Sequence, residues 1–278
     1  MISRCYLEIT NICNLDCLFC PKNNRPKRCM TMEEFDFLTE RLCGKVRFLY
    51  FHLMGEPMVH PHLSEFIQIA RRKKFIPVLT TNGTLCANSQ KVLEAKPHKI
   101  QISLHSYEGN GKNNPEHYIN EVMLFAKKAA SLGIIVVMRL WNQGGYNSKN
   151  NYLLDLISQY QPRPWIERND GWKLDSNLYI EYDRMFEWPD CELEAFHEEK
   201  IFCYALRNQV GVLVDGSVVP CCLDHEGVIT LGNLFEQPLD VILSSSRAKA
   251  IYDGFTAHKS VEPLCRRCGY ALDKKYRS

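Results

Sequence analysis

The stretch Cys13-Asn14-Leu15-Asp16-Cys17-Leu18-Phe19-Cys20 places three thiols within eight residues, at the spacing C-x3-C-x2-C. It directly follows an apolar run, Cys5–Thr10, whose pattern predicts a strand. Active sites of α/β proteins lie at the carboxyl ends of their strands. Three thiolates can hold a four-iron cluster and leave one iron open to a ligand. A zinc site or a set of reactive thiols is the alternative at this point.

The composition places this motif in an ordinary globular protein. Of 278 residues, 45% are apolar and 24% are charged, which excludes a disordered or fibrous chain. Thirteen cysteines are too many for packing, and a chain of this size needs no disulfides, so a reducing compartment and metal binding are expected.

Charge and hydropathy limit the partners. The net charge of +2 argues against nucleic acid or an anionic membrane as a partner. No apolar run reaches the length of a membrane span, and the first residues lack the apolar core of a signal peptide. We therefore expect a cytoplasmic protein, and a monomer.

Strand and helix patterns alternate through the first two thirds of the chain, which predicts parallel strands with right-handed crossovers. The expected strands are Cys5–Thr10, Val46–Leu53, Ile76–Thr81, Ile100–His105 and Ile134–Trp141. The expected helices are Met32–Cys43, Leu63–Lys74, Ser89–Ala95, Glu116–Leu132 and Tyr152–Tyr160. A sixth strand lies in Trp165–Glu167 or in Leu178–Glu181. Five or six units are too few for a closed barrel, so an open partial barrel and a doubly wound sheet both fit.

The pattern changes near residue 183. We expect a first domain at 1–182, a connector at 183–202 and a small region at 203–278. In that region Asp215-Gly216 predicts the turn of a hairpin between Gln209–Val214 and Ser217–Pro220. A helix is expected over Leu239–Ala250.

A second group of thiols lies in this small region, at Cys203, Cys221, Cys265 and Cys268. The hairpin and the C-x2-C near the end of the chain would bring the four together. Four thiolates make a closed site for an iron–sulfur cluster or for zinc. Cys222 is an alternative to Cys221, and Cys191 is a further possible ligand.

The first motif, with an aromatic residue before its last cysteine, resembles the signature of the radical SAM superfamily. The resemblance implies a partial (β/α)6 TIM-like barrel of parallel strands. It also implies a 4Fe–4S cluster on Cys13, Cys17 and Cys20, whose open iron binds S-adenosylmethionine. Reductive cleavage of that cofactor then gives a 5′-deoxyadenosyl radical, which abstracts hydrogen from a substrate.

Further positions support the resemblance. Met54-Gly55-Glu56-Pro57 resembles the family's GGEP motif, with Met54 in place of the first glycine. By this likeness the cofactor contacts are Phe19, Gly55, Glu56, Thr80, Asn82, Ser103 and Arg139. Each of them alone has an ordinary structural explanation; their order along successive strand ends makes the set persuasive.

The four later thiols resemble the SPASM/twitch region of radical SAM enzymes. Cys268 is the last cysteine, whereas full SPASM domains continue with more. The likeness therefore implies the shorter twitch form, a hairpin and a helix with one auxiliary 4Fe–4S cluster. A structural zinc ribbon is the alternative.

An auxiliary cluster beside a radical site is suited to an oxidation. A base, for which we name Asp224 ahead of His225 and Glu226, removes a heteroatom proton, and the substrate radical passes its electron to the auxiliary cluster. The layout is similar to that of the radical SAM dehydrogenase that oxidises the aminocyclitol 2-deoxy-scyllo-inosamine. A flavodoxin or ferredoxin is the expected electron donor.

Two other functions remain open. One is a maturase that forms a thioether or a crosslink in a peptide. Many such enzymes carry a peptide-binding domain before the barrel, and the first expected strand begins too early here for one, which favours a small-molecule substrate. The other is a non-catalytic iron–sulfur or zinc protein.

Overall fold

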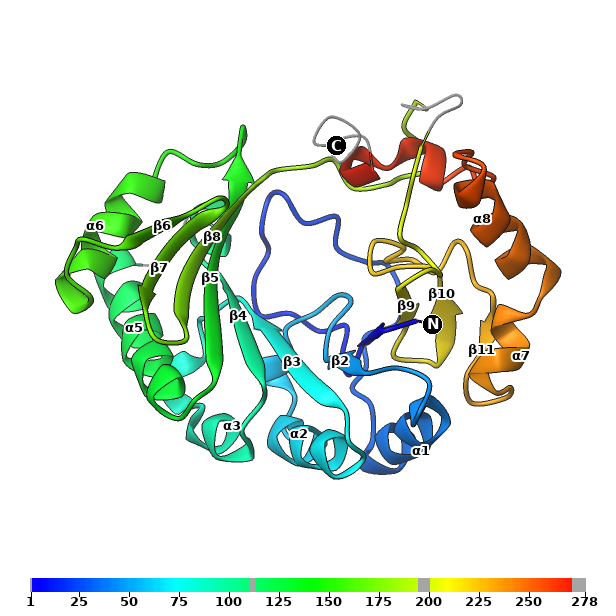
Figure 1. Cartoon of the computed structure of the whole chain (residues 1–278), viewed down its shortest axis with the longest axis horizontal. Helices are drawn as coiled ribbons and strands as arrows, with labels where there is room; N and C mark the ends of the chain where they lie inside the picture. The colour runs from blue at the N-terminus through cyan, green and yellow to red at the C-terminus, as the bar shows by residue number, and fades with distance from the viewer. Residues whose placement is uncertain (1, 111–113, 195–200, 272–278) are drawn as a thin grey trace.

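The computed structural model describes residues 2–110, 114–194 and 201–271. Six strands run parallel and neighbour one another in chain order: β1 (Arg4–Leu7), β2 (Phe48–Tyr50), β3 (Ile76–Thr81), β4 (Lys99–Ser103), β5 (Ile135–Gln143) and β8 (Leu178–Arg184). Figure 1 shows that they form an open arc.

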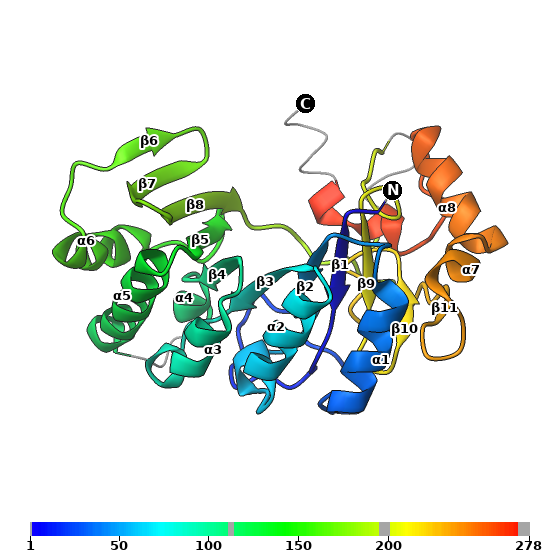
Figure 2. The ribbon, with the colours of Figure 1, turned by 60° about the horizontal axis from the view of Figure 1, so that its bottom comes forward.

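The main helices cover the outer, convex face of this arc (Figures 1 and 2). They are α1 (Met32–Leu42), α2 (Leu63–Arg72), α3 (Gln90–Ala95), α5 (Pro115–Ser131) and α6 (Asn150–Tyr160); a short α4 (Ser106–Asn110) follows β4. A doubly wound sheet carries helices on both faces. The partial (β/α)6 barrel is therefore the architecture, and the predicted fold class is confirmed.

Alternation along the strands decides which side chains face the concave side. In β4 the fully buried Ile100 and Ile102 pack under the helices, whereas Lys99, Gln101 and Ser103 line a cavity. Successive side chains of a strand point to opposite faces, so each strand contributes an apolar outer set and a more polar inner set. The concave face is thus available for binding.

The two stretches proposed for the sixth strand are both strands. β8 is the parallel one, whereas Trp165–Glu167 overlaps β6 (Ile166–Arg168), which pairs antiparallel with β7 (Gly171–Asp175). β7 also pairs antiparallel with β8, so the three strands form a meander at the edge of the sheet.

The expected hairpin is present as β9 (Gln209–Val212) and β10 (Ser217–Val219), with Gly216 at a φ of +85° in the turn. β9 runs parallel to β1, so the hairpin continues the barrel's sheet, and β11 (Gly232–Asn233) follows β10 at the edge. The domain boundaries at 182 and 203 stay predictions.

Local signals explain most helix ends. Thr31 and Glu34 form a capping box at α1, and Gly133, at a φ of +81°, follows the end of α5. The single helix expected over Leu239–Ala250 is wrong in its extent: α7 (Leu239–Leu243) stops, and Ser245 caps a separate α8 (Ser246–Thr256) by accepting the N–H of Ala248. A serine that caps a backbone N–H competes with continued helix.

Candidate active site

The three motif thiols lie on the long loop between β1 and α1. Cys17 is 9% exposed, Cys20 is half-buried and Cys13 is exposed. Burial, and then the charges of Cys20 and Cys13, raises the pKa of the Cys17 thiol to about 12. The three thiols are therefore within electrostatic reach of one another, and as thiolates they require a cation such as iron to stabilise them.

Gly55 lets the segment after β2 lie against this loop. Its φ is +76°, and a Cβ here would stand 2.4 Å from the carbonyl oxygen of Thr10. The N–H of Glu56 donates to the Ile12 carbonyl at 2.9 Å. Glycine alone tolerates both the left-handed backbone and this close approach. Gly55 thus positions the cysteine loop through the backbone.

Glu56 and Asn82 hold the same loop from behind. The Glu56 carboxylate is 2% exposed and accepts the N–H groups of Met58 at 2.9 Å and Asn82 at 2.6 Å. Burial raises its pKa to about 7. The Asn82 amide in turn donates to Asn14 Oδ1 at 2.9 Å, inside the cysteine loop. The cofactor contacts expected of Glu56 and Asn82 stay predictions.

Phe19 packs against α4, where a side chain on Gly109 would stand 2.3 Å from its ring. The Leu18 N–H donates to the Gly109 carbonyl at 2.9 Å, and the Phe19 ring lies 5.2 Å from that of His105. The C-terminal half of the motif is therefore fixed against the end of β4.

Arg139 offers donors toward the concave face. Its Nη2 donates to Ser103 Oγ at 2.9 Å, and its guanidinium lies 4.3 Å from the centroid of the Trp141 ring. Only 8% of the residue is exposed, and within the described residues its buried Nε has no hydrogen-bond partner. Thr80 is a more neutral neighbour whose hydroxyl donates to Gln101 at 3.1 Å. Arg139 is thus suited to a carboxylate ligand.

One cavity of about 1790 Å³ joins these groups. Its lining includes the first three thiols and five of the predicted cofactor contacts: Phe19, Gly55, Thr80, Ser103 and Arg139. It also includes Asp224 and the four later thiols, Cys203, Cys221, Cys265 and Cys268. Glu56 and Asn82 lie outside the lining. Both groups of thiols therefore face one space.

The four later thiols converge from three segments: before β9, after β10 and at a 3-10 turn after α8. Burial raises the pKa of Cys221 well above its usual range, and the charges of neighbouring thiolates raise it further; these are Cys222, Cys203, Cys265 and Cys268. All four of the predicted set pack against the main apolar core, whereas Cys222 packs with Leu53, Met54, Leu213 and Val219. This contact pattern supports Cys221, rather than Cys222, as the fourth member. Cys191 is exposed.

The donor set fits an iron–sulfur cluster better than zinc. Tetrahedral zinc, with Zn–S bonds near 2.3 Å, needs thiolate sulfurs about 3.8 Å apart. Nowhere in residues 2–110, 114–194 and 201–271 do three Cys, His, Asp or Glu side chains gather as for a single metal ion. A cubane spreads its cysteine ligands around four irons. Four buried thiols in mutual electrostatic reach, but more widely spaced, suit the cluster.

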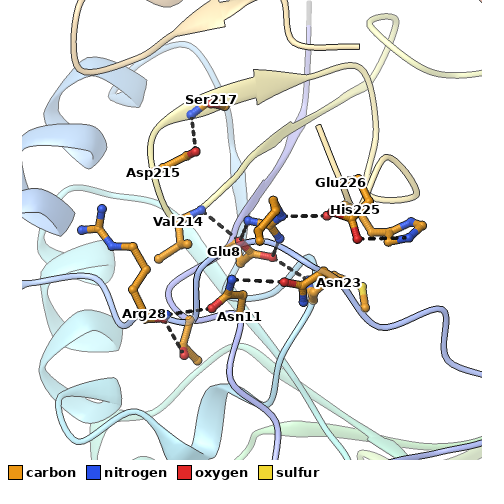
Figure 3. A network of polar contacts seen from close by, with 12 residues as sticks. Glu8, Asn11, Asn23, Arg28, Val214, Asp215, Ser217, His225 and Glu226 are labelled. Carbon is orange, nitrogen blue, oxygen red and sulfur yellow. Dashed lines mark hydrogen bonds and ion pairs between the residues drawn. The ribbon is translucent and has the colours of Figure 1, made fainter. Parts of the chain in front are cut away.

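A network around Glu8 connects the two thiol regions (Figure 3). The fully buried Glu8 carboxylate accepts two guanidinium N–H groups of Arg25 at 2.7 and 2.9 Å, and the N–H groups of Met54 at 3.1 Å and Val214 at 3.0 Å. Arg25 Nε donates to the carbonyl of His225 at 2.8 Å. The cysteine loop, the segment after β2 and the loop after Cys221 thus share one hub, and the sequence analysis missed it.

The loop that carries the predicted base is tied down by that base. Asp224 is 1% exposed, and its two carboxylate oxygens accept the N–H groups of Val228 at 2.9 Å and Ile229 at 2.8 Å. Burial raises its pKa. Glu226 accepts the N–H of Asn24 at 2.8 Å. A catalytic role for Asp224 stays a prediction.

His52 is a candidate that the sequence analysis missed. It follows β2 and lines the cavity, and its buried Nδ1 has no hydrogen-bond partner within the described part of the chain. Burial, and then the charge of Arg139, lowers its pKa to about 3, so the imidazole is neutral. An unpartnered buried nitrogen is available to a ligand. The available signal was its position two residues before Met54-Gly55-Glu56.

Comparison with known families identifies the barrel. Residues 7–157 match the family described as the radical SAM superfamily, which is more than half of the chain. The chain belongs to the radical SAM superfamily. Residues 203–269 match SPASM, described as an iron–sulfur cluster-binding domain. The predicted family is thereby confirmed, and with it the cofactors: a 4Fe–4S cluster, S-adenosylmethionine and auxiliary iron–sulfur binding.

Two curated proteins resemble parts of this radical SAM enzyme. A tungsten-containing aldehyde ferredoxin oxidoreductase cofactor-modifying protein of Pyrococcus furiosus is 34% identical over 85 residues, 29% of this chain and 24% of that protein. A GTP 3′,8-cyclase of Chlorobaculum tepidum is 32% identical over 107 residues, 35% of this chain and 31% of that protein. The matches span about a quarter and about a third of those relatives.

Solved structures share the whole fold. BtrN in complex with AdoMet and 2-DOIA has a TM-score of 0.62 at 16% identity, over 96% of this chain and 93% of that one. Streptococcus suis SuiB bound to S-adenosylmethionine gives 0.61 at 16%, over 97% and 71%. The enzyme anSMEcpe with bound AdoMet gives 0.62 at 11%, over 99% and 92%. At such identities the likeness shows the fold alone.

The membrane question has a limited answer. None of the helices in the described part of this radical SAM enzyme combines the length and the apolarity that crossing a bilayer demands.

Proposed function

We propose that this radical SAM enzyme dehydrogenates a small molecule held between its two groups of thiols. The observation that carries the proposal is the cavity of about 1790 Å³ whose lining includes both groups. When bound, the cofactors supply a 5′-deoxyadenosyl radical that removes a hydrogen atom and an auxiliary cluster that accepts an electron. A substrate in this cavity can lie against both.

The proposal gives the chain's own residues distinct tasks. Cys13, Cys17 and Cys20 hold the first cluster. Cys203, Cys221, Cys265 and Cys268 hold a single auxiliary 4Fe–4S cluster. Around S-adenosylmethionine, Arg139 meets the carboxylate, and the other contacts are Phe19, Gly55, Glu56, Thr80, Asn82 and Ser103.

The base that takes the heteroatom proton is Asp224 in this proposal, with His52 as the competing candidate. Asp224 lines the cavity, but its oxygens also support a loop. His52 has a free nitrogen within the described residues and no such second task. Asp224→Asn and His52→Gln therefore separate the two, because the variant of the true base retains radical formation and loses the oxidised product.

A peptide substrate is the second candidate, because two of the similar folds hold peptides. SuiB has been solved bound to the precursor peptide SuiA, and anSMEcpe with AdoMet and the Cp18Cys peptide. BtrN, with 2-DOIA, supports the small-molecule reading, and this chain covers 93% of it. The identities of 12 to 16% leave the substrate to experiment.

The remaining partners are part of the same proposal. We place the enzyme in the cytoplasm, where a reducing environment keeps thirteen cysteines reduced. A flavodoxin or ferredoxin supplies the electron that starts each turnover, and the enzyme acts as a monomer.

The test is anaerobic reconstitution with iron and sulfide, followed by dithionite and S-adenosylmethionine. We expect 5′-deoxyadenosine, and, with the right polyol or amino sugar, one two-electron oxidised product for each 5′-deoxyadenosine. A crosslinked or thioether peptide would instead establish the second candidate. Absence of 5′-deoxyadenosine from a cluster-loaded protein would favour a non-catalytic iron–sulfur protein.

A further inference from the structure

Two cations stand at one end of the cavity without a carboxylate partner. Arg4 is the first residue of β1 and Lys99 the first of β4, and both line the cavity. Within the described residues neither takes part in an ion pair. Burial lowers the pKa of half-buried Lys99, and the positive charge of Arg4 is among the causes that lower it further. The two charges therefore act on the same space.

The position of this pair is opposite the cysteine loop. Inward-facing residues of β4 are Lys99, Gln101 and Ser103, and Ser103 pairs in register with Arg139. Four residues of strand separate Lys99 from Ser103 by about 13 Å. The two cations thus lie well below the level at which Arg139 is proposed to meet the cofactor, and the cofactor's carboxylate does not neutralise them.

Hydrogen-bond donors, rather than acids, surround them in the lining. Asn208 and Gln209 line the cavity beside Arg4, and Gln209 is its register partner on β9. The nearest carboxylate among the lining residues of β8 is Glu181, which accepts the indole N–H of Trp141 at 3.2 Å. This end of the cavity therefore carries more positive than negative charge.

We propose that Arg4 and Lys99 bind an acidic group of the substrate, a carboxylate or a phosphate. This assignment rests on the proposed function for the identity of the ligand as substrate. Two like charges brought together in a partly dehydrated space repel each other, and an anion between them removes that cost. An ammonium and a guanidinium are the side chains that bind carboxylates and phosphates most strongly.

The placement also orients the substrate. Its acidic end lies at the start of β1 and β4, so the carbon that reacts lies at the other end, toward Cys13, Cys17 and Cys20. We therefore expect an elongated acid whose oxidised carbon is several bonds from its acidic group, not a compact neutral sugar.

The test measures anion binding without turnover. Reconstituted enzyme with S-adenosylmethionine, but without dithionite, is titrated calorimetrically with inorganic phosphate and, separately, with acetate at constant ionic strength. We expect one equivalent to bind, and Arg4→Met and Lys99→Met each to weaken that binding at least tenfold. Lys99→Arg keeps the charge and should retain it. Lys91→Met, an exposed lysine on α3, is the matched control and should bind as the wild type does.

The outcomes separate the possibilities. Tighter binding of phosphate indicates a phosphorylated substrate, and tighter binding of acetate indicates a carboxylic acid. No saturable binding, or equal binding by wild type and Lys99→Met, overturns the proposal. Selenate soaked into crystals gives a direct check, since its anomalous peak must lie between Arg4 and Lys99. Failure of 5′-deoxyadenosine formation would be seen in a separate assay and concerns only the proposed reaction.

Discussion

Arg25 and Glu8 form a bidentate ion pair, 2.7 and 2.9 Å between nitrogen and oxygen, at the junction of the two thiol regions. The Glu8 side chain is fully buried and that of Arg25 is 11% exposed. Because the same carboxylate accepts N–H groups of Met54 and Val214, it fixes three segments at once. The distance between the two clusters depends on this hub, since the cysteine loop and the hairpin meet there.

Glu8→Gln should therefore destabilise the protein strongly. The substitution removes the charge opposite a buried guanidinium, and breaking a buried pair from one side costs about 3 kcal/mol or more. For a chain of this size we expect the midpoint of thermal unfolding to fall by about 6 to 12 °C. Anaerobic melting of the reconstituted protein, followed by circular dichroism, measures it.

Asp155→Asn is the matched control. Its pair with Arg163 spans 3.2 Å, but both side chains are more than half exposed, and such pairs contribute less than about 1 kcal/mol. Equal losses in the two variants would contradict the special role of Glu8. The double variant Glu8→Gln/Arg25→Met should lose less than the sum of its single variants, because the two residues interact directly.

The sequence was sufficient for the barrel and for the thiols because both follow short-range rules. Alternating strand and helix patterns depend on neighbouring residues, and C-x3-C-x2-C lies on one loop. The strand β8 was less certain, because β6 and β7 have the same β-branched and aromatic composition. The turn residues Asn169-Asp170-Gly171, where a Cβ on Gly171 would stand 2.1 Å from the Ile180 carbonyl oxygen, were the signal for that meander.

The Glu8–Arg25 pair and the floor of the cavity were beyond reach of the sequence for a different reason. Arg25 lies in a loop without regular structure, so no periodicity relates it to Glu8, 17 residues earlier. Lys99 is polar at the start of a strand, which is also the pattern of a solvated strand end. Only the curvature of the sheet turns that side chain into a cavity.

Gly55→Ala should disrupt the cysteine loop, because its Cβ would stand 2.4 Å from a backbone oxygen of Thr10. We expect the variant to bind much less iron on the first site and to lose 5′-deoxyadenosine formation. Gly44→Ala tests the backbone term alone: its φ is +72°, with nothing within 4 Å of the added carbon. It should cost about 1 to 2 kcal/mol and keep activity. Similar behaviour of the two variants would mean that the contact with Thr10 is unimportant.

Removing one ligand from each thiol group should separate two activities. Wild type should hold about eight irons per chain, as two four-iron clusters. Cys17→Ala should lose 5′-deoxyadenosine formation entirely. Cys265→Ala should still form 5′-deoxyadenosine but no oxidised product, and each variant should retain about four irons.

Cys43→Ala is the control for that comparison, since this thiol is exposed at the end of α1. It should match the wild type in iron content and in both products. Full product formation by Cys265→Ala would mean that the later thiols do not take up the electron.

Acid should weaken the fold through two histidines that line the cavity. Burial lowers the pKa of His52 to about 3 and that of His105 to about 4, whereas an unfolded histidine titrates near 6.5. The folded pKa lies below the unfolded one, so below pH 6.5 the unfolded chain binds more protons. Stability is therefore complete above pH 6.5 and falls as the pH drops toward 4, by up to about 1.4 kcal/mol per pH unit for each histidine. Unfolding measured between pH 7.5 and 5.5 should show this slope in wild type and a smaller one in His52→Phe; imidazole resonances of His52 and His105 that shift with a midpoint near 6.5 would contradict it.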